Sequence, residues 1–132
     1  MIRQIKFVVL LGIFTLFAHT TSAATMNMIP STGEFGVGKD VAIDLKVDSE
    51  GAGVNAAQAT IRFPADILKV NSISKEGSAL NFWLEEPTFS NETGTISFVG
   101  GTAYGVSGAS IQLIHIVFTA KTAGTAPITV ID

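Results

Sequence analysis

The sequence predicts an all-β domain, built as a two-sheet antiparallel sandwich or a barrel. Past the N-terminal segment, the 132-residue chain has no helical periodicity longer than about a turn. Short runs rich in β-branched and aromatic residues recur instead, roughly every 10–15 residues. Gly, Pro, Asn and Ser separate these runs, as turns between strands require. A chain of this length is expected to hold one domain.

Alternation of apolar and polar residues identifies the individual strands. Val41–Val47 places an apolar residue at every second position, which is typical of a strand with one buried face. Ala57–Phe63 follows the same alternation. Gly100-Gly101 is expected in a turn. The expected strands are Thr25–Ile29, Val41–Val47, Ala57–Phe63, Leu68–Ile73, Leu80–Leu84, Thr95–Val99, Ile111–Ala120 and Ile128–Ile131.

Residues 1–23 are predicted to be a secretory signal peptide, which leaves residues 24–132 as the domain. Arg3 and Lys6 give a basic start, Phe7–Ala18 is apolar, and small residues follow up to the cleavage site. A retained membrane anchor is the alternative, but about 12 apolar residues reach only ~18 Å across a ~30 Å hydrocarbon core. We therefore expect a secreted, extracellular or cell-surface protein with no membrane span after cleavage.

Composition excludes several classes of function. The chain has no cysteine, so it has no disulfide scaffold, cysteine-ligated zinc or thiol nucleophile. Its eight Lys and Arg residues against eleven acids are too few for binding nucleic acid. After cleavage His115 is the only histidine, which leaves no candidates for a two-histidine metal site or a catalytic triad. We therefore expect a noncatalytic protein without a metal or cofactor.

Polysaccharide binding is an alternative function, because exposed aromatic rings stack on sugars. The candidate rings are Phe82, Trp83, Phe89 and Tyr104. Since Phe82 and Trp83 are neighbours in a predicted strand, only one of them can point outward. The other is expected to fill the core.

Residues Gly53–Leu68, GVNAAQATIRFPADIL, carry a resemblance to a known family. The segment resembles the cohesin domain, in which a Gly-rich turn leads into a strand that ends at an aromatic residue, followed by an Asp/Pro corner and a leucine. Gly38–Val41 resembles the turn into the family's second strand. Gly94–Phe98 and Ile111–Lys121 resemble its sixth and eighth strands. The resemblance extends, in order, over residues 25–132.

The resemblance implies a fold and a function. The fold is a nine-stranded jelly-roll sandwich related to cellulose-binding modules, and its last strand, after Ile128–Ile131, is expected to be missing here. Cohesins are noncatalytic modules of secreted or cell-surface scaffold proteins. They bind dockerin domains of polysaccharide-degrading enzymes, and the dockerin carries the Ca²⁺. A surface or adhesion sandwich with a structural role is a further alternative.

The sequence departs from the family's pattern at two outward positions of the third strand. Cohesins of the cellulosome type carry Asn and Asp there, which grip the dockerin. Here Ala56 cannot form the corresponding hydrogen bond, and Gln58 is uncharged.

Strand alternation predicts the residues of a partner-binding surface, on the outward face of the family's third, sixth and eighth strands. Exposed aliphatic residues on such a face indicate a covering partner. Reversed parity in Ile111–Ala120, which would put Leu113 and Val117 in the core, is the alternative. The candidate residues are Gln58, Thr60, Arg62, Ser97, Val99, Leu113, His115 and Val117.

Overall fold

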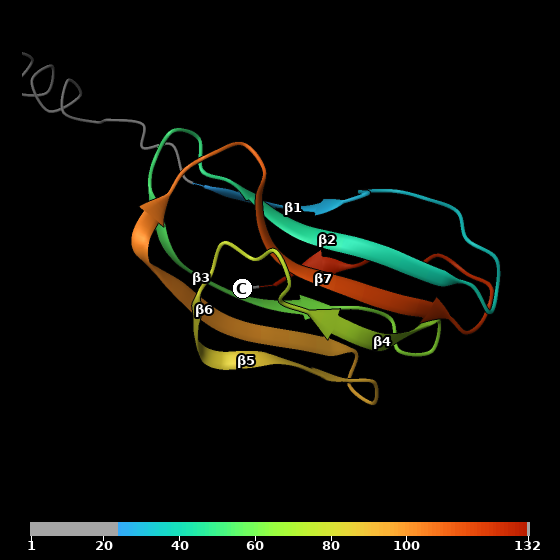
Figure 1. The fold of residues 1–132 in the computed structure, drawn as a ribbon. Coiled ribbons are helices and arrows are strands. Elements are labelled where there is room, and N and C mark those ends of the chain that lie inside the picture. The colour runs from blue at the N-terminus through green and yellow to red at the C-terminus, as the bar shows by residue number, and fades with distance from the viewer. Residues whose placement is uncertain (1–23, 132) are drawn as a thin grey trace, which may run out of the picture.

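The computed structural model describes residues 24–131, which fold into two four-stranded antiparallel sheets (Figure 1). The prediction of an all-β sandwich is confirmed, and residues 24–131 contain no helix. A helix that could cross a membrane is accordingly not found in this part of the chain. The predicted signal peptide, residues 1–23, lies outside the described residues.

Each sheet combines strands that are distant in sequence. The first sheet has the order β1-β2-β7-β4, and the second sheet has the order β5-β6-β3-β8. The chain changes sheet after β2, β3, β4, β6 and β7, in the predicted jelly-roll manner. The first sheet contains β1 (Thr25–Ile29), β2 (Asp40–Asp48), β7 (Ile111–Ala120) and β4 (Leu68–Ser74). The second contains β5 (Phe82–Ser90), β6 (Thr95–Val106), β3 (Val54–Arg62) and β8 (Thr129–Val130).

One core fills the space between the sheets. Every second side chain of the central strands points into it, as the alternation predicted, and each fully buried aliphatic or aromatic side chain contributes about 1.5–3 kcal/mol. Phe63 and Phe118 meet edge to face, with ring centroids 5.3 Å apart. The fully buried apolar residues include Leu45, Ile61, Ile96, Phe98, Leu113, Ile114, Ile116 and Phe118.

Three strands of the second sheet are longer than predicted: β3 begins three residues earlier, and β5 and β6 end later. β5 continues through Glu85-Glu86-Pro87, and register shifts in its pairing with β6 interrupt the alternation there. A proline is tolerated because β5 is an edge strand, with one side unpaired. β6 continues through Gly100-Gly101, so the prediction of a turn at this position is wrong.

The two glycines of β6 make room for the two aromatic residues beside them on β5. Trp83 pairs with Gly100 and Phe82 pairs with Gly101. A Cβ on Gly100 would lie 2.9 Å from the Trp83 ring, and a Cβ on Gly101 would lie 2.4 Å from the Phe82 ring. Trp83 packs on the core, 6.0 Å from the Phe98 ring centroid, while Phe82 stays 47% exposed. Only one of the two neighbours points outward, as predicted.

The predicted outward orientation of Leu113 is wrong. Leu113 and Ile114 are both completely buried. Leu45 pairs with Ile114 but the next residue, Lys46, pairs with Gln112, so Leu113 is an extra residue in β7. Such a β-bulge lets two successive side chains point to the same face of a sheet. Leu113 therefore belongs to the core, without any reversal of the residues that follow it.

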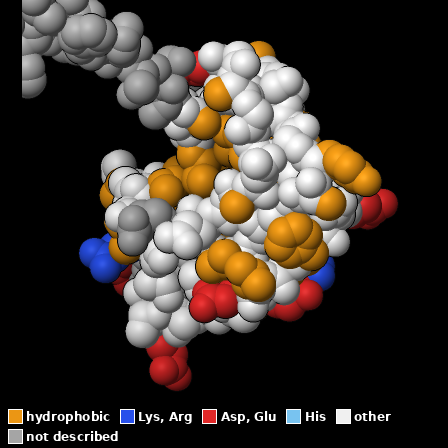
Figure 2. Space-filling model, turned by 90° about the vertical axis from the view of Figure 1, so that its left-hand side faces the viewer, with side chains coloured by type: hydrophobic (Ala, Val, Ile, Leu, Met, Phe, Trp, Pro, Cys, Tyr) orange, Lys and Arg blue, Asp and Glu red, His pale blue; other side chains and the backbone are white. Residues whose placement is uncertain are grey.

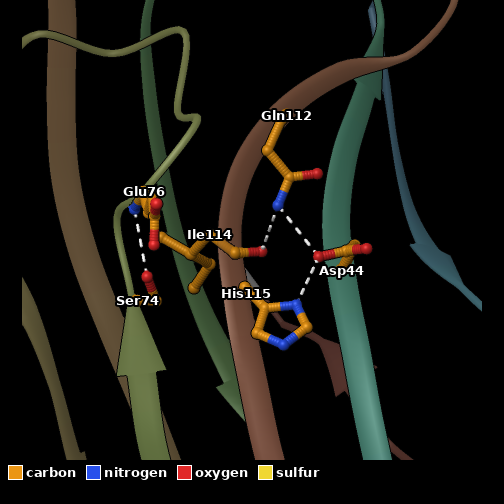
Figure 3. Close-up of polar contacts among 6 residues, drawn as sticks. All are labelled: Asp44, Ser74, Glu76, Gln112, Ile114 and His115. Atoms are coloured by element: carbon orange, nitrogen blue, oxygen red, sulfur yellow. Dashed lines mark hydrogen bonds and ion pairs between the residues drawn. The ribbon is translucent and has the colours of Figure 1, made fainter.

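A polar network on the outer face of the first sheet holds this bulge (Figure 3). Gln112 Nε2 donates to the Ile114 carbonyl at 3.2 Å and to Asp44 Oδ1, on β2, at 3.0 Å. His115 Nδ1 lies 2.7 Å from the same Asp44 oxygen. The hydrogen bond from His115, supported by the one from Gln112, outweighs partial burial and lowers the pKa of Asp44. The network thus connects β2 and β7 at the point where β7 becomes irregular.

Asn91 links the two sheets at the edge formed by β4 and β5. It lies in the turn between β5 and β6, and its Oδ1 accepts a hydrogen bond from Val70 N at 2.8 Å. Its Nδ2 donates to the Val70 carbonyl at 3.1 Å. Because β4 is an edge strand whose register shifts after Val70, this side chain satisfies backbone groups that no neighbouring strand reaches.

Leu113→Asp is expected to unfold the domain, because it places an unpaired charge in the core. Leu113→Ala is expected to cost about 2–5 kcal/mol of unfolding free energy. Leu84→Ala is the matched control, since Leu84 is 77% exposed, and should cost less than about 0.5 kcal/mol. Urea denaturation measures both, and equal losses would contradict the buried position of Leu113.

Asp44→Asn is expected to lower stability more at pH 6 than at pH 3. The folded pKa of Asp44 is lowered, so its ionised form stabilises the fold above the unfolded pKa of about 3.9. That contribution is lost as the pH falls through the folded pKa. Thermal denaturation of both proteins at the two pH values measures the effect. A difference in Tm that stays the same at both pH values would contradict it.

Candidate partner-binding face

Five of the eight predicted site residues lie side by side on the outer face of the second sheet. Gln58, Thr60 and Arg62 alternate outward on β3, opposite the inward Ala57, Ala59 and Ile61. In the antiparallel register Gln58 pairs with Val99 and Thr60 pairs with Ser97. Paired residues share one side of a sheet, so these side chains form two adjacent rows.

The three predicted residues of β7 do not join this face. β7 runs between β2 and β4 in the first sheet, so His115 and Val117 lie on the opposite outer surface of the sandwich, and Leu113 is buried. The resemblance assigned this segment to the family's eighth strand, but it is the seventh strand of this chain. β8 pairs with β3, with Arg62 opposite Thr129. The prediction of one surface containing all eight residues is therefore wrong.

β5 supplies outward residues that the sequence analysis missed. Phe82 pairs with Gly101, Glu85 with Val99, and Thr88 with Ser97. Leu84 has no partner between Trp83 and Glu85, and a second register shift follows between Glu85 and Thr88. These irregularities break the period of two, so alternation alone could not orient β5. Pairing with β6 is what reveals the orientation.

We define the candidate face as a set of outward residues on β5, β6 and β3, three neighbouring strands of the second sheet. Within a row, side chains on neighbouring strands lie about 4.8 Å apart. Successive rows lie about 7 Å apart along the strands. The candidate face consists of Phe82, Glu85 and Thr88 of β5, Ser97 and Val99 of β6, and Ala56, Gln58, Thr60 and Arg62 of β3.

The candidate face changes character from one end to the other. Phe82 is exposed at the end where β5 begins, with Glu85 in the next row. Hydroxyl groups occupy the centre, where Thr88 Oγ1 and Ser97 Oγ lie 3.5 Å apart. Arg62 lies at the far end. In the view onto the end where β5 begins, hydrophobic side chains lie close to acidic ones (Figure 2).

The chemistry of these residues is suited to association. Residues 24–131 bring together no group of three His, Asp or Glu side chains that could hold a metal ion. A surface hollow of about 690 Å³ lies along residues 26–32, in β1 and the chain that follows it, and so does not belong to the candidate face. Polar, aliphatic and aromatic side chains on a sheet surface provide hydrogen bonds and apolar contact to a partner.

Comparison with known proteins identifies close counterparts of this fold. The sixth cohesin of scaffoldin B from Acetivibrio cellulolyticus, solved with a dockerin, has a TM-score of 0.64 at 15% identity, over 83% of this chain and 82% of the other. The second type II cohesin of the ScaA scaffoldin from the same organism has a TM-score of 0.65 at 12% identity, over 86% and 73%. The OlpC cohesin of Clostridium thermocellum, from a type I cohesin–dockerin complex, has a TM-score of 0.59 at 13% identity, over 73% of this chain and 71% of the other.

At these identities the solved structures show similarity of fold alone. No curated protein sequence matches the chain. The family model described as the cohesin domain matches residues 26–132, which is most of the sequence and includes both sheets except for Thr25. The chain therefore belongs to the cohesin domain family.

Proposed function

We propose that this chain is a noncatalytic docking module that binds a dockerin domain through the candidate face. The observation that carries the proposal is the pairing of β3, β5 and β6, which places hydroxyl, amide and apolar side chains in regular rows on one sheet. Relatives of the same fold were solved in complex with dockerins, which supports the choice of partner. The Ca²⁺ needed for binding would be carried by the dockerin.

Export fits the proposed role. Residues 1–23 are predicted to direct secretion, and a secreted or cell-surface cohesin would hold dockerin-bearing enzymes in a polysaccharide-degrading assembly. In such an assembly the cohesin contributes position, and catalysis belongs to the partner.

Polysaccharide binding is the second candidate function, and one observation favours it. Phe82 on β5 and Tyr104 on β6 expose aromatic rings at the same end of the second sheet, and Tyr104 is 83% exposed. Retardation of the protein in gels that contain soluble cellulose derivatives would support this function, provided that Tyr104→Ala removes the retardation.

The two outer faces of the sandwich offer a matched pair of variants for testing the docking role. Val99 lies on the candidate face and Val117 lies on the first sheet, and both are half-buried. Val99→Arg is expected to weaken dockerin binding at least about tenfold, because it places a long charged side chain in the contact. Val117→Arg is expected to leave the affinity within about twofold of wild type.

Calorimetric titration with each Ca²⁺-loaded dockerin encoded in the same genome measures these affinities, and thermal denaturation checks that both variants fold. Chelation of Ca²⁺ is expected to abolish binding. The docking role is contradicted if none of these dockerins binds the wild-type chain. The proposed location is contradicted if Val117→Arg weakens binding and Val99→Arg does not.

A further inference from the structure

One end of the candidate face differs from the rest in having exposed apolar side chains. Phe82 reaches over Gly101, next to Ala56, which pairs with that glycine on the other side. Leu84, the extra residue of the β5 bulge, lies in β5 between Trp83 and Glu85, next to this end of the face, and is 77% exposed. Val99 lies one row away, about 7 Å along β6. This end presents apolar surface to solvent and has little hydrogen-bonding capacity at Ala56.

A carboxylate lies within this apolar surface. Glu85 pairs with Val99 in the register, so its side chain shares the outward direction of Phe82. The neighbouring Glu86 forms an ion pair with Lys75, but Glu85 forms no ion pair with any residue between 24 and 131. Within the candidate face the cation is Arg62, which lies about 13 Å along β3 from Gln58, the β3 residue in the same row as Glu85. Lys75 lies over the Trp83 ring and forms its ion pair with Glu86. The charge of Glu85 is therefore available to a partner.

The Phe82 ring occupies space that a side chain at position 101 would otherwise fill. A Cβ at position 101 would lie 2.4 Å from Cζ and 2.8 Å from Cε2 of that ring. Real Cβ atoms do not approach so closely, so any other residue would push the ring away from β6. Exposed aromatic rings that pack on a strand surface in this way are among the side chains that contribute strongly to interfaces.

We propose that the partner seats an apolar side chain against Phe82 and Leu84 and places a Lys or Arg beside Glu85. On the proposed function, that partner is a dockerin whose contact surface carries an apolar residue next to a basic one. Apolar contact at this end takes the place of a hydrogen bond to the partner, because the side chain of Ala56 can form none. Gly101 acts as a positioning residue, and the Arg62 end contributes less to the affinity than this end does.

Charge reversal at the two ends of the face provides the test. Glu85→Lys and Phe82→Ala are each expected to weaken the binding of the cognate Ca²⁺-loaded dockerin by at least about tenfold. Arg62→Glu, at the far end of the face, is expected to weaken binding less than Glu85→Lys does. Lys69→Glu, on the exposed side of β4 in the first sheet, is the matched control and is expected to leave the affinity within about twofold of wild type. Replacement of the partner's basic residue by Glu should restore binding to Glu85→Lys and weaken binding to wild type.

The role of Gly101 is tested by combining variants. Gly101→Ala is expected to weaken binding about as much as Phe82→Ala does. In a protein that already carries Phe82→Ala, adding Gly101→Ala should have a much smaller effect, because the closest contact of the added Cβ is then the Asn55 carbonyl oxygen, at 3.1 Å. Tm is measured for every variant, and a loss of affinity from Gly101→Ala that is as large in the Phe82→Ala protein as in wild type would overturn the positioning role.

The outcomes separate this inference from the function on which it rests. If the wild-type chain binds no dockerin of its genome, the proposed function fails and the inference fails with it. If wild type binds but Arg62→Glu is more harmful than Glu85→Lys, the docking function stands and the inference is wrong. If Phe82→Ala instead abolishes binding to hydroxyethyl cellulose and leaves dockerin affinity unchanged, this end of the face is a carbohydrate site.

Discussion

Burial of one side of every strand between two sheets is the constraint on which the rest of the structure depends. Each central strand gives alternate side chains to a single core, and the residues between them remain on the surface. The outward residues of each sheet are therefore placed as regularly as the inward ones. In the second sheet this order aligns Gln58 with Val99 and Thr60 with Ser97, and it produces the candidate face as a direct consequence of packing.

Sequence patterns predicted the strands whose alternation is unbroken. β2 and β3 have regular inward and outward residues, so their orientations follow from local sequence. The bulge in β7 could not be foreseen, because Leu113 and Ile114 are both apolar and either parity gives a reasonable strand. Sheet membership was equally hidden. It depends on pairing between distant strands, and β7 pairs with β2 and β4 in preference to β3.

Irregular strands also explain which residues of the candidate face could be predicted from the sequence and which could not. Residues of β3 and β6 were identified from alternation, while those of β5 were not, because Leu84 and Pro87 interrupt the period. Gly100 and Gly101 resemble a turn in sequence, yet in the structure they accommodate Trp83 on the inside and Phe82 on the outside. A pair of small residues in one strand thus leaves space for two large ones in its neighbour, and one of the two large residues is exposed to a partner.

The central claim, that a partner docks on the second sheet, is tested most directly by NMR mapping of the complex. The ¹⁵N-labelled chain would be titrated with an unlabelled, Ca²⁺-loaded dockerin, and cross-saturation of its amides would be recorded. The account predicts saturation at β3, β5 and β6, strongest near Phe82 and Glu85, and none at Asp44 or His115 on the first sheet. Saturation confined to β2 and β7 would contradict it.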